Sequence, residues 1–83
     1  MTVDRSAVVE KLRAVYLRVK DDPVDASRVT EQASLATDLG IDSLDLLEMR
    51  FDVDTAFGVK MSDADVSRMK TIGDVVDIIL ARV

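Results

Sequence analysis

The residues best suited to chemistry lie in one short stretch near the middle of the chain. It reads Asp38-Leu39-Gly40-Ile41-Asp42-Ser43-Leu44, which places a hydroxyl next to carboxylates and a glycine. A serine hydroxyl becomes a nucleophile when a neighbouring base takes its proton. The sequence contains no His, and its spacing places no Lys beside Ser43. We therefore do not expect Ser43 to be a catalytic nucleophile of its own.

The composition excludes several other kinds of site. The chain has no Cys and no His, which removes disulfides, thiolate or imidazole metal sites and Ser-His-Asp catalysis. The acidic pairs Asp52/Asp54 and Asp63/Asp65 lack the glycine and terminal glutamate of a calcium loop, so no metal site is expected. With an aromatic content of only 4%, the chain offers no platform for stacking bases.

The charge of the chain is unevenly distributed. The net charge is −5, yet residues 1–20 carry five basic and two acidic side chains. Residues 38–65 carry eight acidic and two basic side chains. An acidic segment repels phosphate backbones and attracts basic protein surfaces, so we expect protein partners and no nucleic acid.

The length and apolar content indicate one small globular domain over residues 1–83, with 48% hydrophobic residues. The first residues contain no apolar stretch typical of a signal peptide, and no run approaches the roughly 20 apolar residues of a membrane span. We expect a cytoplasmic monomer without a membrane partner.

The first elements that must position Ser43 are a helix and a long loop. Apolar residues at helical spacing predict a helix over about residues 4–20, with Asp4 or Ser6 as its cap. Pro23 disfavours helix at the residue before it, and residues 21–42 form a long connection with a short helical turn near 25–30. The residues expected to anchor this loop to the core are Val24, Val29 and Leu35.

Three further helices are expected after the loop. One begins near Ser43 and ends near Phe57, with Gly58 as its stop. A short one follows Ser62, which has capping-box spacing to Asp65, and the last begins at Thr71. No segment alternates apolar and polar residues as a strand does. The predicted fold is therefore all-α, a four-helix bundle with a long first loop and a short third helix.

The helix that begins near Ser43 has two apolar faces. On a helical wheel one arc holds Leu46, Met49, Val53, Ala56 and Phe57, and the nearly opposite arc holds Leu44, Leu47 and Phe51. Two explanations are open. Both arcs are buried because the helix is central, or the second arc is a docking patch rimmed by Glu48 and Asp54 for a basic partner.

The seven-residue stretch resembles the start of the second helix in the acyl carrier protein family. The resemblance extends over nearly the whole chain, through its length, the long first loop, the Phe57-Gly58 helix end and the Thr71-Ile72-Gly73-Asp74 opening of the last helix. It implies that a phosphopantetheinyl transferase attaches 4′-phosphopantetheine from coenzyme A to Ser43, with Asp42 and Leu44 as the other residues of the cofactor-binding site. Acyl chains would then be carried as thioesters on the thiol of that arm.

The resemblance also implies a surface for partners and a place for cargo. Pathway enzymes such as acyltransferases and ketosynthases would dock through basic surfaces onto five residues of this helix, namely Leu44, Leu47, Glu48, Phe51 and Asp54. The opening toward the third helix would be lined by Met61, Val66 and Met69, although core packing explains these three residues equally well. The chain itself would be a carrier and not an enzyme.

The chain departs from the family pattern at several positions. Arg50 stands where the family usually has an apolar residue, and Thr55 and Lys60 stand where fatty-acid carriers usually have acids. The first helix is also more basic than a housekeeping carrier would suggest. These departures favour a discrete carrier of a specialised pathway, such as polyketide assembly, over primary fatty-acid synthesis.

A second hypothesis belongs to a different class. The chain would be a small all-helical interaction module without a prosthetic group, and Ser43 would serve only as a helix cap. A Ser43→Ala variant separates the two hypotheses, because only a carrier loses covalent loading. The lost cap is expected to lower stability by roughly 0.5–2 kcal/mol.

Overall fold

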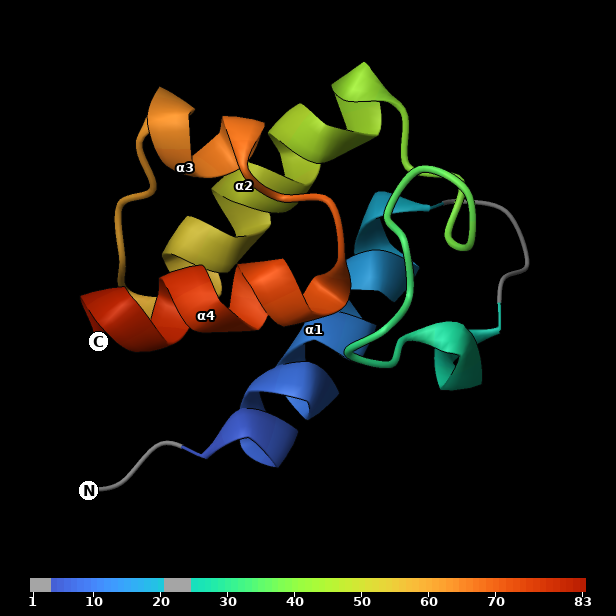
Figure 1. The fold of residues 1–83 in the computed structure, drawn as a ribbon, viewed down its shortest axis with the longest axis horizontal. Helices are drawn as coiled ribbons and strands as arrows, with labels where there is room; N and C mark the ends of the chain where they lie inside the picture. Colours follow the sequence, from blue (N-terminus) through green and yellow to red (C-terminus); the bar gives the residue numbers. More distant parts are fainter. Residues whose placement is uncertain (1–3, 21–24) are drawn as a thin grey trace.

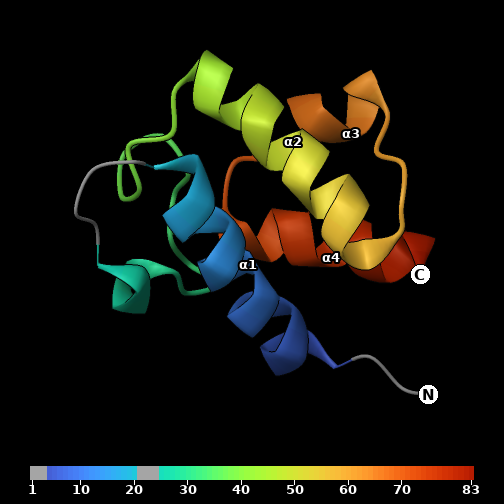
Figure 2. The same cartoon turned by 180° about the vertical axis from the view of Figure 1, so that it is seen from behind.

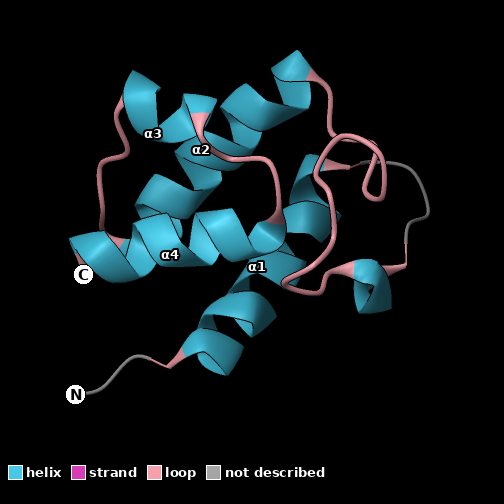
Figure 3. Ribbon diagram, viewed as in Figure 1, coloured by secondary structure: helices cyan, strands magenta, loops and turns pink. Residues whose placement is uncertain are grey.

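The computed structural model describes residues 4–20 and 25–83, and within them it shows helices and no β-sheet (Figure 1). The only extended pairing there is an isolated bridge between Ser34 and Thr71. The helices are α1 (Arg5–Val19), the 3-10 turn η1 (Ala26–Arg28), α2 (Ser43–Phe57), α3 (Asp63–Ser67) and α4 (Ile72–Arg82). The predicted all-α fold with a short third helix is confirmed (Figure 3). The break at Pro23 and the anchor Val24 lie outside the described residues.

The helix boundaries follow from side chains that satisfy the first free amides of each helix. Asp4, not Ser6, caps α1 by accepting the N–H of Ala7. The starts of α3 and α4 are reciprocal capping boxes, Ser62 with Asp65 and Thr71 with Asp74. At the other end of α2, Gly58 takes a left-handed φ of 64°, which a residue with a side chain adopts at a cost.

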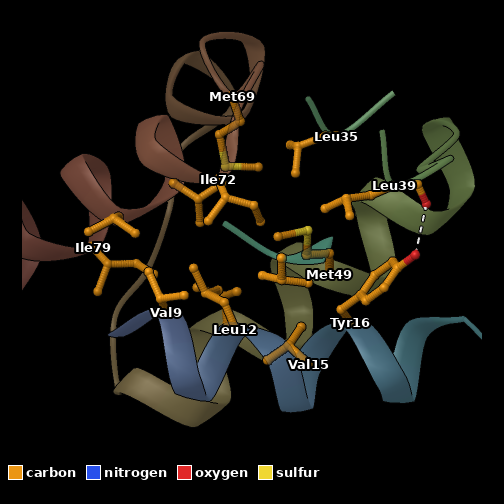
Figure 4. Packing of buried hydrophobic residues seen from close by; sticks show 14 of the residues in the cluster. Val9, Leu12, Val15, Tyr16, Leu35, Leu39, Met49, Met69, Ile72 and Ile79 are labelled. Atoms are coloured by element: carbon orange, nitrogen blue, oxygen red, sulfur yellow. Dashed lines mark hydrogen bonds between the residues drawn. The ribbon is translucent and has the colours of Figure 1, made fainter. Parts of the chain in front are cut away.

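The core lies between α1, α2, α4 and the long loop, as Figure 4 shows. Lys20 contacts Asp45 and Lys11 lies over the ring of Phe57, so α1 and α2 run in opposite directions. The short α3 lies beside α2 on the side away from α1 (Figures 1 and 2). The fully buried members of the core include Val8, Leu12, Val15, Val29, Val53, Met61, Val75, Val76 and Ile79.

The long loop is fixed to the connection between α3 and α4. Residues 31–35 lie beside residues 70–73, and the predicted anchors Val29 and Leu35 are both buried. The backbone hydrogen bonds run from Leu35 N to Lys70 O (3.0 Å), from Ile72 N to Ala33 O (3.0 Å) and from Gly73 N to Glu31 O (2.8 Å). The end of the loop that precedes Ser43 is therefore attached to the same body as α4.

Candidate functional site

Ser43 is the first residue of α2, and its side chain is exposed. Asp42 is the cap: its Oδ1 accepts the N–H of Asp45 at 2.8 Å, and Oδ2 of Asp45 accepts the N–H of Asp42 at 3.3 Å. The hypothesis that Ser43 caps the helix is therefore wrong, because the aspartate before it already does so. Within the described residues the Ser43 hydroxyl makes no hydrogen bond, which leaves it open to modification.

The turn before Ser43 is held by its apolar residues. Leu39 and Ile41 are buried, and the N–H of Ile41 donates to the carbonyl of Leu35 at 2.8 Å. Between them Gly40 has a φ of +64°, a left-handed conformation that reverses the chain and favours glycine. This geometry points the chain outward at Asp42 and Ser43 while both flanking side chains stay in the core.

The last turn of α1 holds this turn from the other side. Tyr16 donates its hydroxyl to the carbonyl of Leu39 at 3.3 Å (Figure 4), and Lys20 Nζ donates to the carbonyl of Gly40 at 3.0 Å. Lys20 also forms a mostly buried ion pair with Asp45, 2.9 Å from Nζ to Oδ2. The Lys20 hydrogen bond holds the pKa of Asp45 below its usual range.

Sequence patterns did not reveal the contacts of Tyr16 and Lys20. In the sequence both residues are only parts of the first helix, and their partners lie at least twenty residues further along the chain. Tyr16 fits the apolar stripe of that helix, and Lys20 fits the usual preference for a basic residue at a helix C-terminus. The signal that could have indicated them is their position one turn apart at the end of a helix.

A hollow of about 350 Å³ lies directly beside Ser43. Its apolar lining comes from the loop, α2 and the connection between α3 and α4. The residues that border it are Leu35, Ala36, Ile41, Asp42, Ser43, Leu46, Met69 and Lys70. Met69 and Leu35 lie next to each other at this end of the core (Figure 4). Of the three residues expected to line an opening toward α3, Met69 borders this hollow, Met61 is fully buried and Val66 packs partly buried against the core.

The two apolar faces of α2 have different surroundings. Met49 and Val53 are buried in the core, whereas Leu44, Leu47 and Phe51 are 66%, 61% and 76% exposed. The explanation in which both faces are buried is therefore wrong. We call the three exposed residues the outer patch. Glu48 is exposed beside them and makes no ion pair within the described residues.

The remaining residue of the expected partner surface, Asp54, has a local role. Its Oδ1 accepts the N–H of Met61 at 3.1 Å, so the carboxylate reaches the connection between α2 and α3. Arg50, one turn earlier, donates to the carbonyl of the same Met61 at 2.6 Å and to Asp63 at 2.7 Å. The structure thus brings Asp42, Ser43, Leu44, Leu47, Glu48 and Phe51 onto the exposed start and outer side of α2, and it turns Asp54 toward α3.

The described ranges, 4–20 and 25–83, contain neither a metal-binding cluster nor a membrane-spanning helix. No group of three or more acidic side chains there is arranged to hold a metal ion. None of the helices in these ranges has the length and hydrophobicity needed to cross a membrane.

Comparisons with known proteins all identify the same family. Residues 11–79 match the family model described as "Phosphopantetheine attachment site". The chain is 52% identical to an acyl carrier protein of Thermotoga maritima over 56 residues, 68% of this chain and 69% of the relative. It is 37% identical to an acyl carrier protein of Thermosynechococcus vestitus over 78 residues, 93% of each chain.

Comparison of the fold with solved structures identifies the same family. The solved structure of an acyl carrier protein from Enterococcus faecalis matches with a TM-score of 0.75 and 28% identity, over 98% of this chain and all of the other. Family members bear phosphopantetheine and work with a phosphopantetheinyl transferase and with the enzymes of their pathway. This chain therefore belongs to the acyl carrier protein family and is a non-catalytic carrier.

Proposed function

We propose that Ser43 is the residue that receives 4′-phosphopantetheine and that the arm carries acyl intermediates as thioesters. The observation that carries this proposal is the exposed Ser43 hydroxyl, without a hydrogen bond in the described part of the chain, at the start of a helix already capped by Asp42. Attachment joins the Ser43 oxygen to the phosphorus of the phosphopantetheine group, breaks the pyrophosphate bond of coenzyme A and releases adenosine 3′,5′-bisphosphate, while the hydroxyl proton passes to a base. The sequence contains no histidine to take that proton, so in this proposal the transferase supplies the base.

The start of α2 suits the product of this reaction. The first amides of a helix have no partner within the helix, and they form the positive end of its dipole. Asp42 satisfies the amide of Asp45, which leaves the amides of Ser43 and Leu44 without a partner inside the helix. A phosphodiester on Ser43 would carry its negative charge next to these groups.

The outer patch is proposed as the surface that partner enzymes bind. Leu44 belongs to it and directly follows Ser43, so a partner on the patch lies within reach of the arm. Exposed Glu48 gives the patch an acidic edge, which suits the basic surfaces proposed for transferase, acyltransferase and ketosynthase. We keep Asp54 only at the edge of this surface that faces α3, because its half-buried carboxylate accepts the N–H of Met61. We place this monomeric carrier in the cytoplasm.

We further propose that the carrier serves a dedicated pathway such as polyketide assembly and not primary fatty-acid synthesis. Support comes from Thr55 and Lys60, which are exposed, and from the basic side chains of α1. These residues make the surface around the end of α2 less acidic than the surface around the start of α2. The test is chain elongation by a reconstituted fatty-acid synthase and by a polyketide ketosynthase, with only the second expected to accept the loaded carrier.

The attachment proposal is tested by intact mass. The apo-protein is incubated with coenzyme A and a broad-specificity phosphopantetheinyl transferase, alongside Ser43→Ala and the matched control Ser67→Ala, whose hydroxyl only donates to the carbonyl of Ala64. We expect one added arm on the wild type and on Ser67→Ala, and none on Ser43→Ala. An arm on Ser43→Ala would contradict the proposal, because the attachment would then lie at another residue. No arm on the folded wild type would contradict it as well and would favour the interaction module.

A further inference from the structure

Arg50 crosses from α2 to the start of α3. Its guanidinium donates to the carbonyl oxygen of Met61 at 2.6 Å and to Oδ1 of Asp63 at 2.7 Å. Asp54 accepts the N–H of the same Met61 at 3.1 Å. Two side chains one turn apart on α2 thus hold both polar backbone groups of one residue whose side chain is fully buried. We call Arg50, Asp54 and Met61 the α3 clamp.

The α3 clamp lies further along α2 than the hollow beside Ser43 and is adjacent to it. Leu46 borders the hollow, and Arg50 follows it by four residues, which places the two side chains on the same side of the helix. Met69, two residues beyond the end of α3, also borders the hollow, while Arg50 binds Asp63 at the start of α3. A chain that entered the hollow and continued between α2 and α3 would therefore meet the Arg50 guanidinium.

Displacing Arg50 is unfavourable for an apolar chain. A methylene chain offers no acceptor to the guanidinium and no donor to the Met61 carbonyl, so both groups would lose a charge-assisted bond. The pair with Asp63 contributes little to this resistance, because that carboxylate is 97% exposed. The bond to the Met61 carbonyl, in the partly buried connection, is the one that resists entry.

We propose that Arg50 is a specificity-determining residue that keeps long saturated acyl chains out of the space between α2 and α3. Short acyl groups fit in the hollow beside Ser43, and longer saturated chains stay outside the helices. This inference rests on the proposed attachment at Ser43 and assigns the class of cargo that the carrier protects.

The experiment compares short and long cargo on the same arm. Acetyl- and octanoyl-phosphopantetheine are transferred from the corresponding coenzyme A thioesters to the wild type, Arg50→Met and Arg18→Met, and loading is verified by intact mass. Arg18→Met is the matched control because Arg18 also pairs with an aspartate of α2, Asp52, but from α1. The rate at which hydroxylamine cleaves each thioester then reports whether the acyl chain is sheltered.

In the wild type and in Arg18→Met we expect the octanoyl thioester, whose chain stays outside the helices, to be cleaved at least as fast as the acetyl thioester. In Arg50→Met we expect the octanoyl thioester to be cleaved at least about tenfold more slowly than in the wild type. Without the guanidinium, the acyl chain can enter the apolar space between α2 and α3. Arg50→Lys should give partial protection, since one ammonium keeps the charge without the two-armed contact. This second variant decides the question if circular dichroism shows that Arg50→Met is unfolded.

Equal rates of octanoyl thioester cleavage in the wild type and in the Arg50 variants would overturn the proposal, whether the thioester is protected in all of these proteins or in none. Octanoyl protection in the wild type would overturn it as well. Absence of loading on the wild type is a different result, because it contradicts attachment at Ser43 before Arg50 is tested.

Discussion

The inner and outer faces of α2 carry similar apolar side chains in opposite surroundings. Met49 and Val53 on the inner face are buried against the core, whereas Leu47 and Phe51 on the outer face are mostly exposed. The inner face stabilises the fold, and the exposed outer face is the one proposed to bind partner enzymes. The difference shows that apolar periodicity identifies the helix faces that can be buried. The packing of the other elements decides which of these faces is buried in the fold.

The strongest test of this comparison is truncation of one residue on each face. Met49→Ala should lower the free energy of unfolding by about 2–5 kcal/mol, because it leaves a cavity in the core. Leu47→Ala, the matched control, should change it by no more than about 0.5 kcal/mol. Urea denaturation of the apo-protein measures both. A loss for Leu47→Ala as large as that for Met49→Ala would mean that the outer face is covered.

The second test concerns binding and not stability. Phe51→Ala should lower kcat/KM of the phosphopantetheinyl transferase roughly tenfold, because exposed aromatic residues often dominate an interface. Its melting temperature should stay near that of the wild type. Leu17, an exposed residue of α1 outside the outer patch, provides the control. If Leu17→Ala slowed loading as much as Phe51→Ala, the patch would have no special role.

The third test separates the cap from the attachment residue at the start of α2. Asp42→Ala should lower the free energy of unfolding by about 0.5–2 kcal/mol, because the amide of Asp45 loses its acceptor. Ser43→Ala should change it by less than about 0.5 kcal/mol, since no hydrogen bond within the described residues is lost. Thermal and urea unfolding of the two apo variants are compared directly. Equal losses would contradict the assignment of the cap to Asp42.

The smallest expected effect comes from mild acid, which acts on neither apolar face. The N–H of Ser62 and the guanidinium groups of Arg82 and Arg68 hold the pKa of buried Asp65 well below its usual 3.8. The unfolded chain therefore takes up the proton first, so the stability that Asp65 contributes is complete above about pH 5 and is lost as the pH falls further.

This pH dependence is measured as the melting temperature between pH 7 and pH 3. We expect no loss from Asp65 between pH 7 and pH 5, and a progressive decrease below pH 4. Asp65→Asn should be less stable at pH 7 and should show a flatter decrease in acid. A wild-type melting temperature that does not fall below pH 4 would exclude this contribution.

Much of the fold follows from local signals in the sequence. The capping pairs Ser62/Asp65 and Thr71/Asp74 and the stop at Gly58 were predictable, because each depends on residues within one turn of a helix end. The position of Ser43 at the start of α2 was predictable for the same reason. The exposure of the outer patch was left open, since both faces of α2 satisfy the same periodicity.

The contacts between elements were not predictable from the sequence. The contacts of Lys20 with Asp45 and of Arg50 with Met61 join different elements of the fold. In the sequence, Lys20 and Arg50 can each be explained without these contacts. Arg50 illustrates the difficulty. On the helical wheel it is only a departure from an apolar position, and its meaning depends on where α3 begins.

The pairing of residues 31–35 with residues 70–73 has a consequence for the order of folding. Its hydrogen bonds join segments separated by more than thirty residues, whereas the bonds within each helix are local and form first. The amides of Leu35, Ile72 and Gly73 gain their protein acceptors only when the loop and α4 have docked. These three amides should therefore exchange with solvent deuterium together, because the same opening of the loop from α4 exposes all of them.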